Sequence, residues 1–170
     1  KNGIEQLLSN SNSPEVILLD DAFQHRKVKA GYYIMLTSYD DLYINDFILP
    51  TGNLRESRAG VQRANIVIVT KCPSNLSLDD QNAIKKQLNL SSNQSLFFTF
   101  IDYDDVVFSD KKAIKVSEIK STDKILLAGI AKPESFFAYL KQENDECLTF
   151  PDHHHFSESE LLEIKNKAKS

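Results

Sequence analysis

Short apolar runs alternate along the chain with segments in which apolar residues recur every three or four positions. The runs are rich in β-branched and aromatic residues and therefore predict strands. Six strands are expected, at residues 16–20, 32–37, 66–70, 96–101, 125–128 and 147–150. At 66–70 the apolar residues are continuous rather than alternating, which is typical of a strand buried on both faces of a parallel sheet.

Three helices are predicted between these strands, each from a start signal. Residues 77–90 begin at Ser77, whose hydroxyl can cap a helix, and two acids follow at the positive end of the helix dipole. Pro133 can take the first position of a second helix. Ser157 and Glu160 have the spacing of a capping box for a third. The alternation of strands and helices predicts an α/β/α sandwich with a mostly parallel sheet.

One segment, residues 102–122, interrupts this alternation. It is polar and charged, with short strand-like pieces at 106–108 and 113–116. We interpret it as a β-ribbon linker. The predicted organisation is therefore a first domain at 1–101, the linker, and a second, smaller α/β domain at 123–170.

Composition narrows the classes of function. The formal net charge is −4, so the chain has no general positive field for nucleic acid. Cys72 and Cys147 are far apart and lack metal-site spacing, which favours a reducing compartment. No apolar run approaches the ~20 residues that span a bilayer. The chain begins at Lys1, in what reads as the middle of a helix, and we expect further residues before it in the parent protein.

The stretch DDAFQHR, residues 20–26, places two adjacent acids where a buried strand is predicted to end. In an open parallel sheet, ligands bind at the carboxyl ends of the strands, and an acid there can hold Mg²⁺ directly or through water. A solvated strand end or a helix cap would explain Asp20 and Asp21 about as well. The addition of Gln24, His25 and Arg26 favours a functional site.

A second stretch, LPTGNLRES, covers residues 49–57. Arg55 can clamp a phosphate through its fork of donors, and Glu56 can hold that arginine or reach a metal. A surface turn with an ion pair is the alternative interpretation. Arg58 and Arg63 make the region locally basic in an acidic protein, which favours an anionic ligand.

The third stretch, FPDHHHF at residues 150–156, places three histidines after Asp152. Adjacent side chains cannot all face one ion, so a metal site would need ligands from elsewhere. A histidine oriented by its neighbouring acid suits acid–base work equally well. A loop that caps the following helix explains His154 and His155 better than His153.

Together these motifs resemble the tetraacyldisaccharide 4'-kinases, the lipid A 4'-kinase family of Gram-negative bacteria. The matching stretches are DDAFQHR (20–26), LPTGNLRE (49–56), RANIVIVTK (63–71), AGIAKPESF (128–136) and FPDHHHFS (150–157). The resemblance implies a P-loop-kinase-like α/β/α domain joined by a β ribbon to a second α/β domain. It also implies transfer of the ATP γ-phosphate to the 4'-hydroxyl of tetraacyldisaccharide 1-phosphate, with Mg²⁺.

The resemblance also implies roles for individual residues. Asp20 and Asp21 would be the Walker B-like acids that hold the metal. We assign Asp20, Asp21, Glu56 and His153 to catalysis, and Gln24, His25 and Arg55 to cofactor binding. His153 would come from the second domain, and in the family it is paired with a catalytic Asp of the first.

Two further expectations follow from the resemblance. The sequence contains no G-x-x-x-x-G-K-[ST] phosphate loop, and the family carries that loop ahead of the position of Lys1. We therefore expect the chain to be a fragment, inactive alone, that also lacks the end of the second domain. The parent enzyme is expected at the cytoplasmic face of the inner membrane, bound through parts outside this chain.

Two other functions remain open from the residues alone. A metal-dependent phosphoesterase could use Asp152, His153 and His154 with the acid pair, although such enzymes usually need further Asp and His clusters. A non-catalytic nucleotide- or partner-binding module would agree with the missing phosphate loop.

Overall fold

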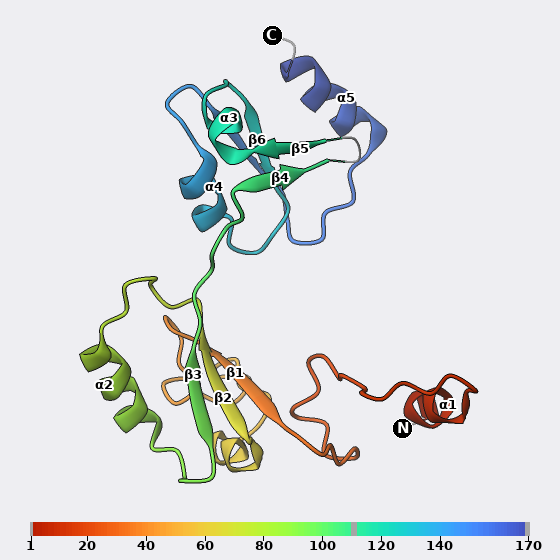
Figure 1. Cartoon of the computed structure of the whole chain (residues 1–170), viewed down its shortest axis with the longest axis vertical. Helices are drawn as coiled ribbons and strands as arrows, with labels where there is room; N and C mark the ends of the chain where they lie inside the picture. Colours follow the sequence, from red (N-terminus) through yellow and green to blue (C-terminus); the bar gives the residue numbers. More distant parts are fainter. Residues whose placement is uncertain (1, 110–111, 169–170) are drawn as a thin grey trace. The chain divides into compact units, whose positions relative to one another are not determined.

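Strands and helices alternate along most of the chain in the computed structural model, which describes residues 2–109 and 112–168 (Figure 1). The chain divides into two compact units, Lys1–Asp102 and Tyr103–Ser170. The first contains α1 (Asn2–Ser9), β1 (Ile34–Ser38), the 3₁₀ helix η1 (Arg58–Arg63), β2 (Ile66–Thr70), α2 (Leu78–Leu88) and β3 (Ser95–Phe98). The second contains β4 (Val106–Phe108), β5 (Ala113–Lys115), α3 (Val116–Lys120), β6 (Ile125–Ala128), α4 (Glu134–Leu140), β7 (Glu146–Thr149) and α5 (Glu158–Lys167). The predicted α/β class with parallel sheets is confirmed.

The first unit is built on a three-stranded parallel sheet in the order β1-β2-β3. Helix α2 lies alongside this sheet (Figure 1). Val67 and Val69 on the central strand are fully buried, in one cluster with Ile84 and Leu88 of α2. The Ser77 hydroxyl accepts the Asp80 backbone N–H, as its predicted capping role requires. One face of the sheet therefore forms the core.

The other face of this sheet is apolar and open. Leu36 pairs in register with Ile68, which pairs with Phe97, so the three side chains lie on the same face. Leu36 is 64% exposed and Phe97 is 52% exposed. We call Ile34, Leu36, Ile68 and Phe97 the open sheet face. Burial of residues 66–70 on both faces was predicted, and for this face the prediction is wrong: Ile66 and Ile68 are only half-buried.

The predicted strand at residues 16–20 is absent. Residues 16–19 have no regular structure, and Val16 and Leu18 are 72% and 89% exposed. A strand exists only where a neighbour completes its hydrogen-bond ladder, and no described segment pairs with residues 16–19. Apolar character alone could not supply that partner. Asp20 and Asp21 therefore lie in a turn rather than at the end of a buried strand.

The other predicted elements agree with the structure to within about three residues, and the largest difference is at 96–101, where β3 ends at Phe98. Pro133 precedes α4 as its N-cap rather than occupying the first helical position. Two short elements, η1 and α3, were not predicted, because neither is long enough to show an apolar period. The helix expected around Lys1 is α1, described from Asn2; Lys1 itself lies outside the described residues.

The second unit has a parallel pair, β6 with β7, and an antiparallel hairpin, β4 with β5. Val116, Leu126 and Leu140 form its core. Because Val116 follows β5 directly, the hairpin is tied to this core. The predicted division into domain, linker and domain stays a prediction, and residues 110–111 of the proposed linker lie outside the described residues. Within the described ranges, no helix is long and apolar enough to cross a bilayer.

Candidate functional site

The two stretches at residues 20–26 and 49–56 meet through an ion pair. Arg55 Nη1 donates to Asp21 Oδ2 over 2.6 Å, and both side chains are more than half exposed. The hydrogen bond from Arg55 holds the pKa of the Asp21 carboxyl below its ordinary value. Asp21, Gln24, Arg55 and Glu56 also contribute to the lining of one open cavity of about 290 Å³. The structure thus brings together four residues that the sequence predicted for the site.

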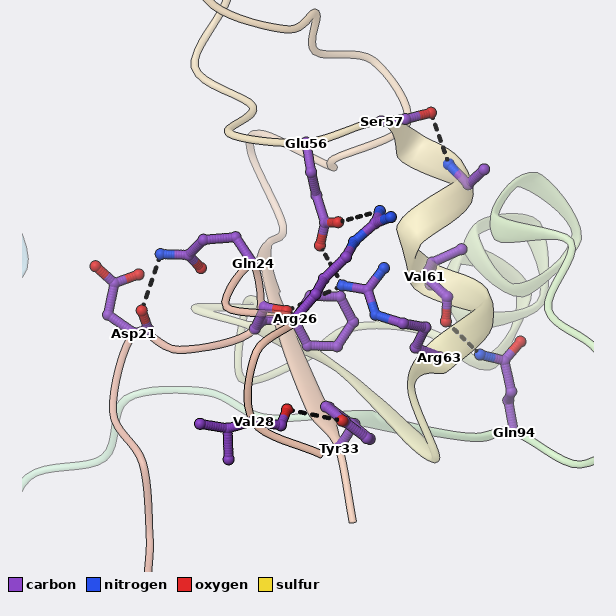
Figure 2. Close-up of polar contacts among 12 residues, drawn as sticks. Asp21, Gln24, Arg26, Val28, Tyr33, Glu56, Ser57, Val61, Arg63 and Gln94 are labelled. Atoms are coloured by element: carbon purple, nitrogen blue, oxygen red, sulfur yellow. Dashed lines mark hydrogen bonds and ion pairs between the residues drawn. The ribbon is translucent and has the colours of Figure 1, made fainter. Parts of the chain in front are cut away.

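The turn that carries the two acids is held by short local contacts. The Asp21 N–H donates to Asp20 Oδ1 over 2.9 Å. Gln24 Nε2 donates to the Asp21 carbonyl over 2.9 Å (Figure 2). Asp21 has a φ of 46°, a left-handed conformation that is uncommon for residues other than glycine. Gln24 is therefore used inside the turn, whereas the His25 side chain is exposed.

The loop that leads to Arg55 is closed by Asp46, which the sequence did not single out. The backbone N–H groups of Phe47 and Asn53 both donate to its carboxylate. A Cβ at Gly52 would collide with the Asp46 carboxylate and with the Phe47 carbonyl, so only glycine fits there. This closed loop places Arg55 within hydrogen-bond distance of Asp21.

Glu56 makes different contacts from those predicted. Its carboxylate accepts from Arg26 Nη2 over 2.9 Å and from Arg63 Nη2 over 2.6 Å (Figure 2). The hydrogen bond from Arg63 is the largest cause that holds the pKa of Glu56 below its ordinary value. The side chain of Glu56 is only 20% exposed. Glu56 therefore holds Arg26 and Arg63, and in this structure it does not hold Arg55.

The predicted basic patch is mostly occupied by contacts within the first unit. The Arg63 guanidinium also donates to the Phe23 carbonyl over 2.9 Å and lies 4.8 Å from the centre of the Phe23 ring. Arg58 donates to the Asp46 carbonyl and lies over the Phe47 ring. Of the arginines predicted for this patch, Arg55 and Arg63 each pair with another predicted site residue, Asp21 and Glu56 respectively, whereas Arg58 bonds to the Asp46 carbonyl.

The donor set at the acid pair fits Mg²⁺. This ion takes oxygen ligands, usually one or two carboxylates together with waters and substrate phosphates. Asp20 and Asp21 are exposed and offer such oxygens. A transition-metal site needs three or four protein ligands, and within the described residues no three His, Cys, Asp or Glu side chains gather to form one.

The histidine loop of the second unit separates its histidines by role. His154 Nε2 lies 3.0 Å from Glu160 Oε1, and its ring stacks on Phe150. Glu160 also completes the predicted capping box with Ser157 at the start of α5. His153 has a φ of 56° and a side chain that is 94% exposed, with Nε2 4.0 Å from Asp152 Oδ2. His154 thus fixes the loop, and His153 extends from it into solvent.

The roles assigned to these residues stay predictions, although the structure adds partners that the sequence did not indicate. Asp46, Arg26 and Arg63 hold the two stretches in place. Arg26 was noticed only as a member of its motif, and Arg63 only as a positive charge and as the first residue of another motif. No regular spacing links them to Glu56, because their contacts are set by turns and by a single 3₁₀ segment.

Comparison with known proteins gives a consistent result. Residues 1–170 match the family described as Tetraacyldisaccharide-1-P 4'-kinase (LpxK). The chain is 64% identical over 172 residues to a protein of Flavobacterium psychrophilum named Tetraacyldisaccharide 4'-kinase, covering 100% of this chain and 50% of that protein. A relative with the same name from Flavobacterium johnsoniae is 66% identical over 167 residues, covering 98% of this chain and 49% of that protein. Another from Bacteroides fragilis is 46% identical over 174 residues, covering 97% of this chain and 46% of that protein. The chain thus spans about half the length of these curated relatives, and no solved structure matches it significantly.

Proposed function

The chain belongs to the tetraacyldisaccharide-1-P 4'-kinase family, and we propose that it is part of an enzyme that phosphorylates a lipid A precursor. The proposed reaction transfers the γ-phosphoryl group of ATP to the 4'-hydroxyl of tetraacyldisaccharide 1-phosphate. The observation that carries this proposal is the ion pair between Asp21 and Arg55. It joins a candidate metal ligand to a candidate phosphate clamp, both from motifs that resemble this family.

The reaction needs groups that stabilise the charge on the phosphate oxygens and a base that takes the proton of the hydroxyl group. A bond forms between the 4'-oxygen and the γ-phosphorus, the bond to the β,γ-bridging oxygen breaks, and the hydroxyl proton leaves to a base. Phosphoryl transfer depends mainly on positioning and on stabilising charge at the phosphate oxygens. Asp20 and Asp21 would hold Mg²⁺, which supplies that charge stabilisation when bound. Arg55 would bind phosphate oxygens, and His153 would accept or orient the hydroxyl proton.

The finer parts of the proposal rest on the same resemblance. The first unit would belong to a P-loop-kinase-like domain, and the segment at 102–122 would be a ribbon that leads to a second α/β domain. Gln24 and His25 would contribute to nucleotide binding. The enzyme would act at the cytoplasmic face of the bacterial inner membrane, with the membrane contact made outside residues 1–170.

A transfer assay tests the proposal. A protein of the relatives' full length that contains this chain is expected to move radiolabelled γ-phosphate from ATP to tetraacyldisaccharide 1-phosphate only when Mg²⁺ is present. Residues 1–170 alone are expected to show no turnover, because the sequence has no G-x-x-x-x-G-K-[ST] loop to supply phosphate binding. Failure of the full-length protein to transfer phosphate, or turnover by the 170 residues alone, would contradict this proposal.

Metal analysis separates the kinase from the phosphoesterase. If His153 is an acid–base group, His153→Ala is expected to slow transfer by roughly 10²–10⁴-fold with an unchanged Mg²⁺ requirement. A phosphoesterase would instead use the histidine to ligate Zn²⁺ or Mn²⁺. Stoichiometric Zn²⁺ or Mn²⁺ in the purified protein, lost in His153→Ala, would overturn the kinase assignment.

A further inference from the structure

Glu56 has the contacts of a structural brace rather than those of a reacting group. We propose that Glu56 is a positioning residue, which ties the turn at residues 20–26 to η1 through Arg26 and Arg63. The proposal includes a role for Gly60, whose missing side chain leaves room for the Glu56 carboxylate. The expected effect of Glu56 on the rate of phosphate transfer rests on the proposed kinase function. The expected effect of Glu56 on the order of the turn does not.

Both oxygens of Glu56 are already occupied. Oε2 accepts from Arg26 over 2.9 Å, and Oε1 accepts from Arg63 over 2.6 Å. Charge-assisted hydrogen bonds of this kind are about twice as strong as neutral ones. A carboxylate shared by two guanidinium groups is a poor proton acceptor, and the positive charge of both groups disfavours a metal cation beside it. Glu56 is therefore not suited to direct chemistry in this arrangement.

The contacts of Glu56 fix the acid-bearing turn at two points. Arg26 lies at the end of that turn, and Arg63, at the end of η1, holds the Phe23 carbonyl and covers the Phe23 ring. The Phe23 ring also packs edge-on against Tyr33, with ring centres 6.1 Å apart. The start of the turn is then held by Gln24, which donates to the Asp21 carbonyl. A shift of Glu56 would be transmitted to Asp21 through this sequence of contacts.

The position of Glu56 in the chain adds a second route to the site. Glu56 directly follows Arg55, whose guanidinium pairs with Asp21. Because the two residues share a peptide bond, anchoring the Glu56 side chain also restricts where the Arg55 side chain can begin. One brace thus positions both members of the Asp21–Arg55 pair.

Gly60 leaves room for the Glu56 carboxylate because it has no side chain. A Cβ at this position would lie 2.8 Å from Glu56 Cδ and 3.0 Å from each carboxylate oxygen. No described glycine has a positive φ, so the backbone at Gly60 does not itself require glycine. The residue is buried in η1, next to the carboxylate. The space above its Cα is therefore kept free for Glu56.

Hydrogen exchange on the chain itself tests the brace. The N–H groups of His25, Arg26 and Val28 are bonded inside the turn, so Glu56→Ala and Gly60→Ala are each expected to speed their exchange about tenfold or more. Exchange in β2 should not change, which shows that the fold is kept. Gly31→Ala is the matched control, because a Cβ there meets nothing within 4 Å. Unchanged exchange of the turn in both variants would overturn the proposal.

A double variant isolates the role of Gly60. If Gly60→Ala acts only by displacing the Glu56 carboxylate, then Glu56→Ala combined with Gly60→Ala is expected to exchange at the rate of Glu56→Ala alone. Additive effects of the two changes would show that Gly60 serves another purpose, and would overturn that part of the proposal.

Kinetics of the full-length protein separate positioning from direct chemistry. Glu56→Ala is expected to lower kcat about 10²-fold, the scale of a displacement of roughly 1 Å at a reacting centre. Glu56→Gln, which keeps one acceptor oxygen, should restore part of the rate, and the Mg²⁺ concentration for half-maximal activity should not move. A shifted Mg²⁺ requirement with unchanged turn exchange would identify Glu56 as a metal ligand and overturn the proposal. If the wild-type protein transfers no phosphate, the proposed function fails, and the exchange experiment still decides whether the brace exists.

Discussion

Arg55 and Asp21 lie 34 residues apart in the chain, and their side chains form an ion pair of 2.6 Å. A candidate phosphate clamp and a candidate metal ligand therefore neutralise each other. Under the proposed function, Asp21 would hold a cation that supplies charge stabilisation, and Arg55, beside it, would bind the phosphate oxygens.

The ion pair predicts how Asp21 titrates. The hydrogen bond from Arg55 lowers the pKa of Asp21 from its ordinary value of 3.8, so the carboxylate form persists to lower pH. In Arg55→Gln the pKa should rise towards 3.8, and high salt should have a similar but smaller effect on the wild type. Carbon-detected NMR titration of the Asp21 carboxyl measures this change. An unshifted titration in Arg55→Gln would show that the pair does not form in solution.

The acid pair predicts a kinetic phenotype. In the full-length protein, Asp20→Asn and Asp21→Asn are each expected to lower kcat at least about a hundredfold, because a neutral amide binds Mg²⁺ poorly where charge develops. Steady-state transfer assays at saturating ATP and Mg²⁺ measure the loss. Asp40→Asn, at an exposed turn, is the control and should retain its rate. Near wild-type activity in both site variants would show that Asp20 and Asp21 have no catalytic role and are ordinary residues of a surface turn.

The Glu56 brace predicts a pH-dependent stability. Because the folded-state pKa of Glu56 is lowered from 4.5, its contribution is present above that pH and is lost as the pH falls through the folded-state value. At pH 7, Glu56→Gln should lower the free energy of unfolding of the first unit by about 1–2 kcal/mol. The difference from wild type should shrink well below pH 4.5.

Urea unfolding followed through the NMR signals of β2 measures that difference. Glu15→Gln, at an exposed position, is the control and should follow the wild type at every pH. A deficit in Glu56→Gln that stays constant down to about pH 2 would show that its charge is not what stabilises the unit.

The left-handed backbone at His153 predicts an unusual ranking of variants. His153 has a φ of 56°, where side chains with a Cβ are strained by about 1 kcal/mol and β-branched ones by more. His153→Gly is therefore expected to be at least as stable as the wild type, and His153→Val to be less stable than His153→Gly by more than about 1 kcal/mol. Unfolding of the second unit, followed through the signals of β6, gives the ranking. Equal stability of the Gly and Val variants would mean that the loop adopts another conformation in solution.

The sequence predicted those elements whose signals are local. The strand at Ile66–Thr70 and the capping box of Ser157 with Glu160 both depend on neighbouring residues, and both are present. The strand expected at residues 16–20 failed because pairing depends on a partner that apolar composition does not reveal. Within the site, the sequence indicated Asp21 and Arg55 but not that Glu56 would pair with Arg63. That contact depends on the short 3₁₀ helix η1 and on the absence of a side chain at Gly60.

The open sheet face has a thermodynamic consequence. The heat capacity of unfolding and the slope of stability against denaturant both measure the apolar area that is newly hydrated when a chain unfolds. Leu36 and Phe97 are already more than half hydrated in the folded chain, so they add little to either quantity. The 170 residues should thus unfold with a heat capacity change below the usual ~12–15 cal/mol/K per residue, and with a flatter stability curve. Any partner that covers this face should increase both the heat capacity of unfolding and the slope of stability against denaturant.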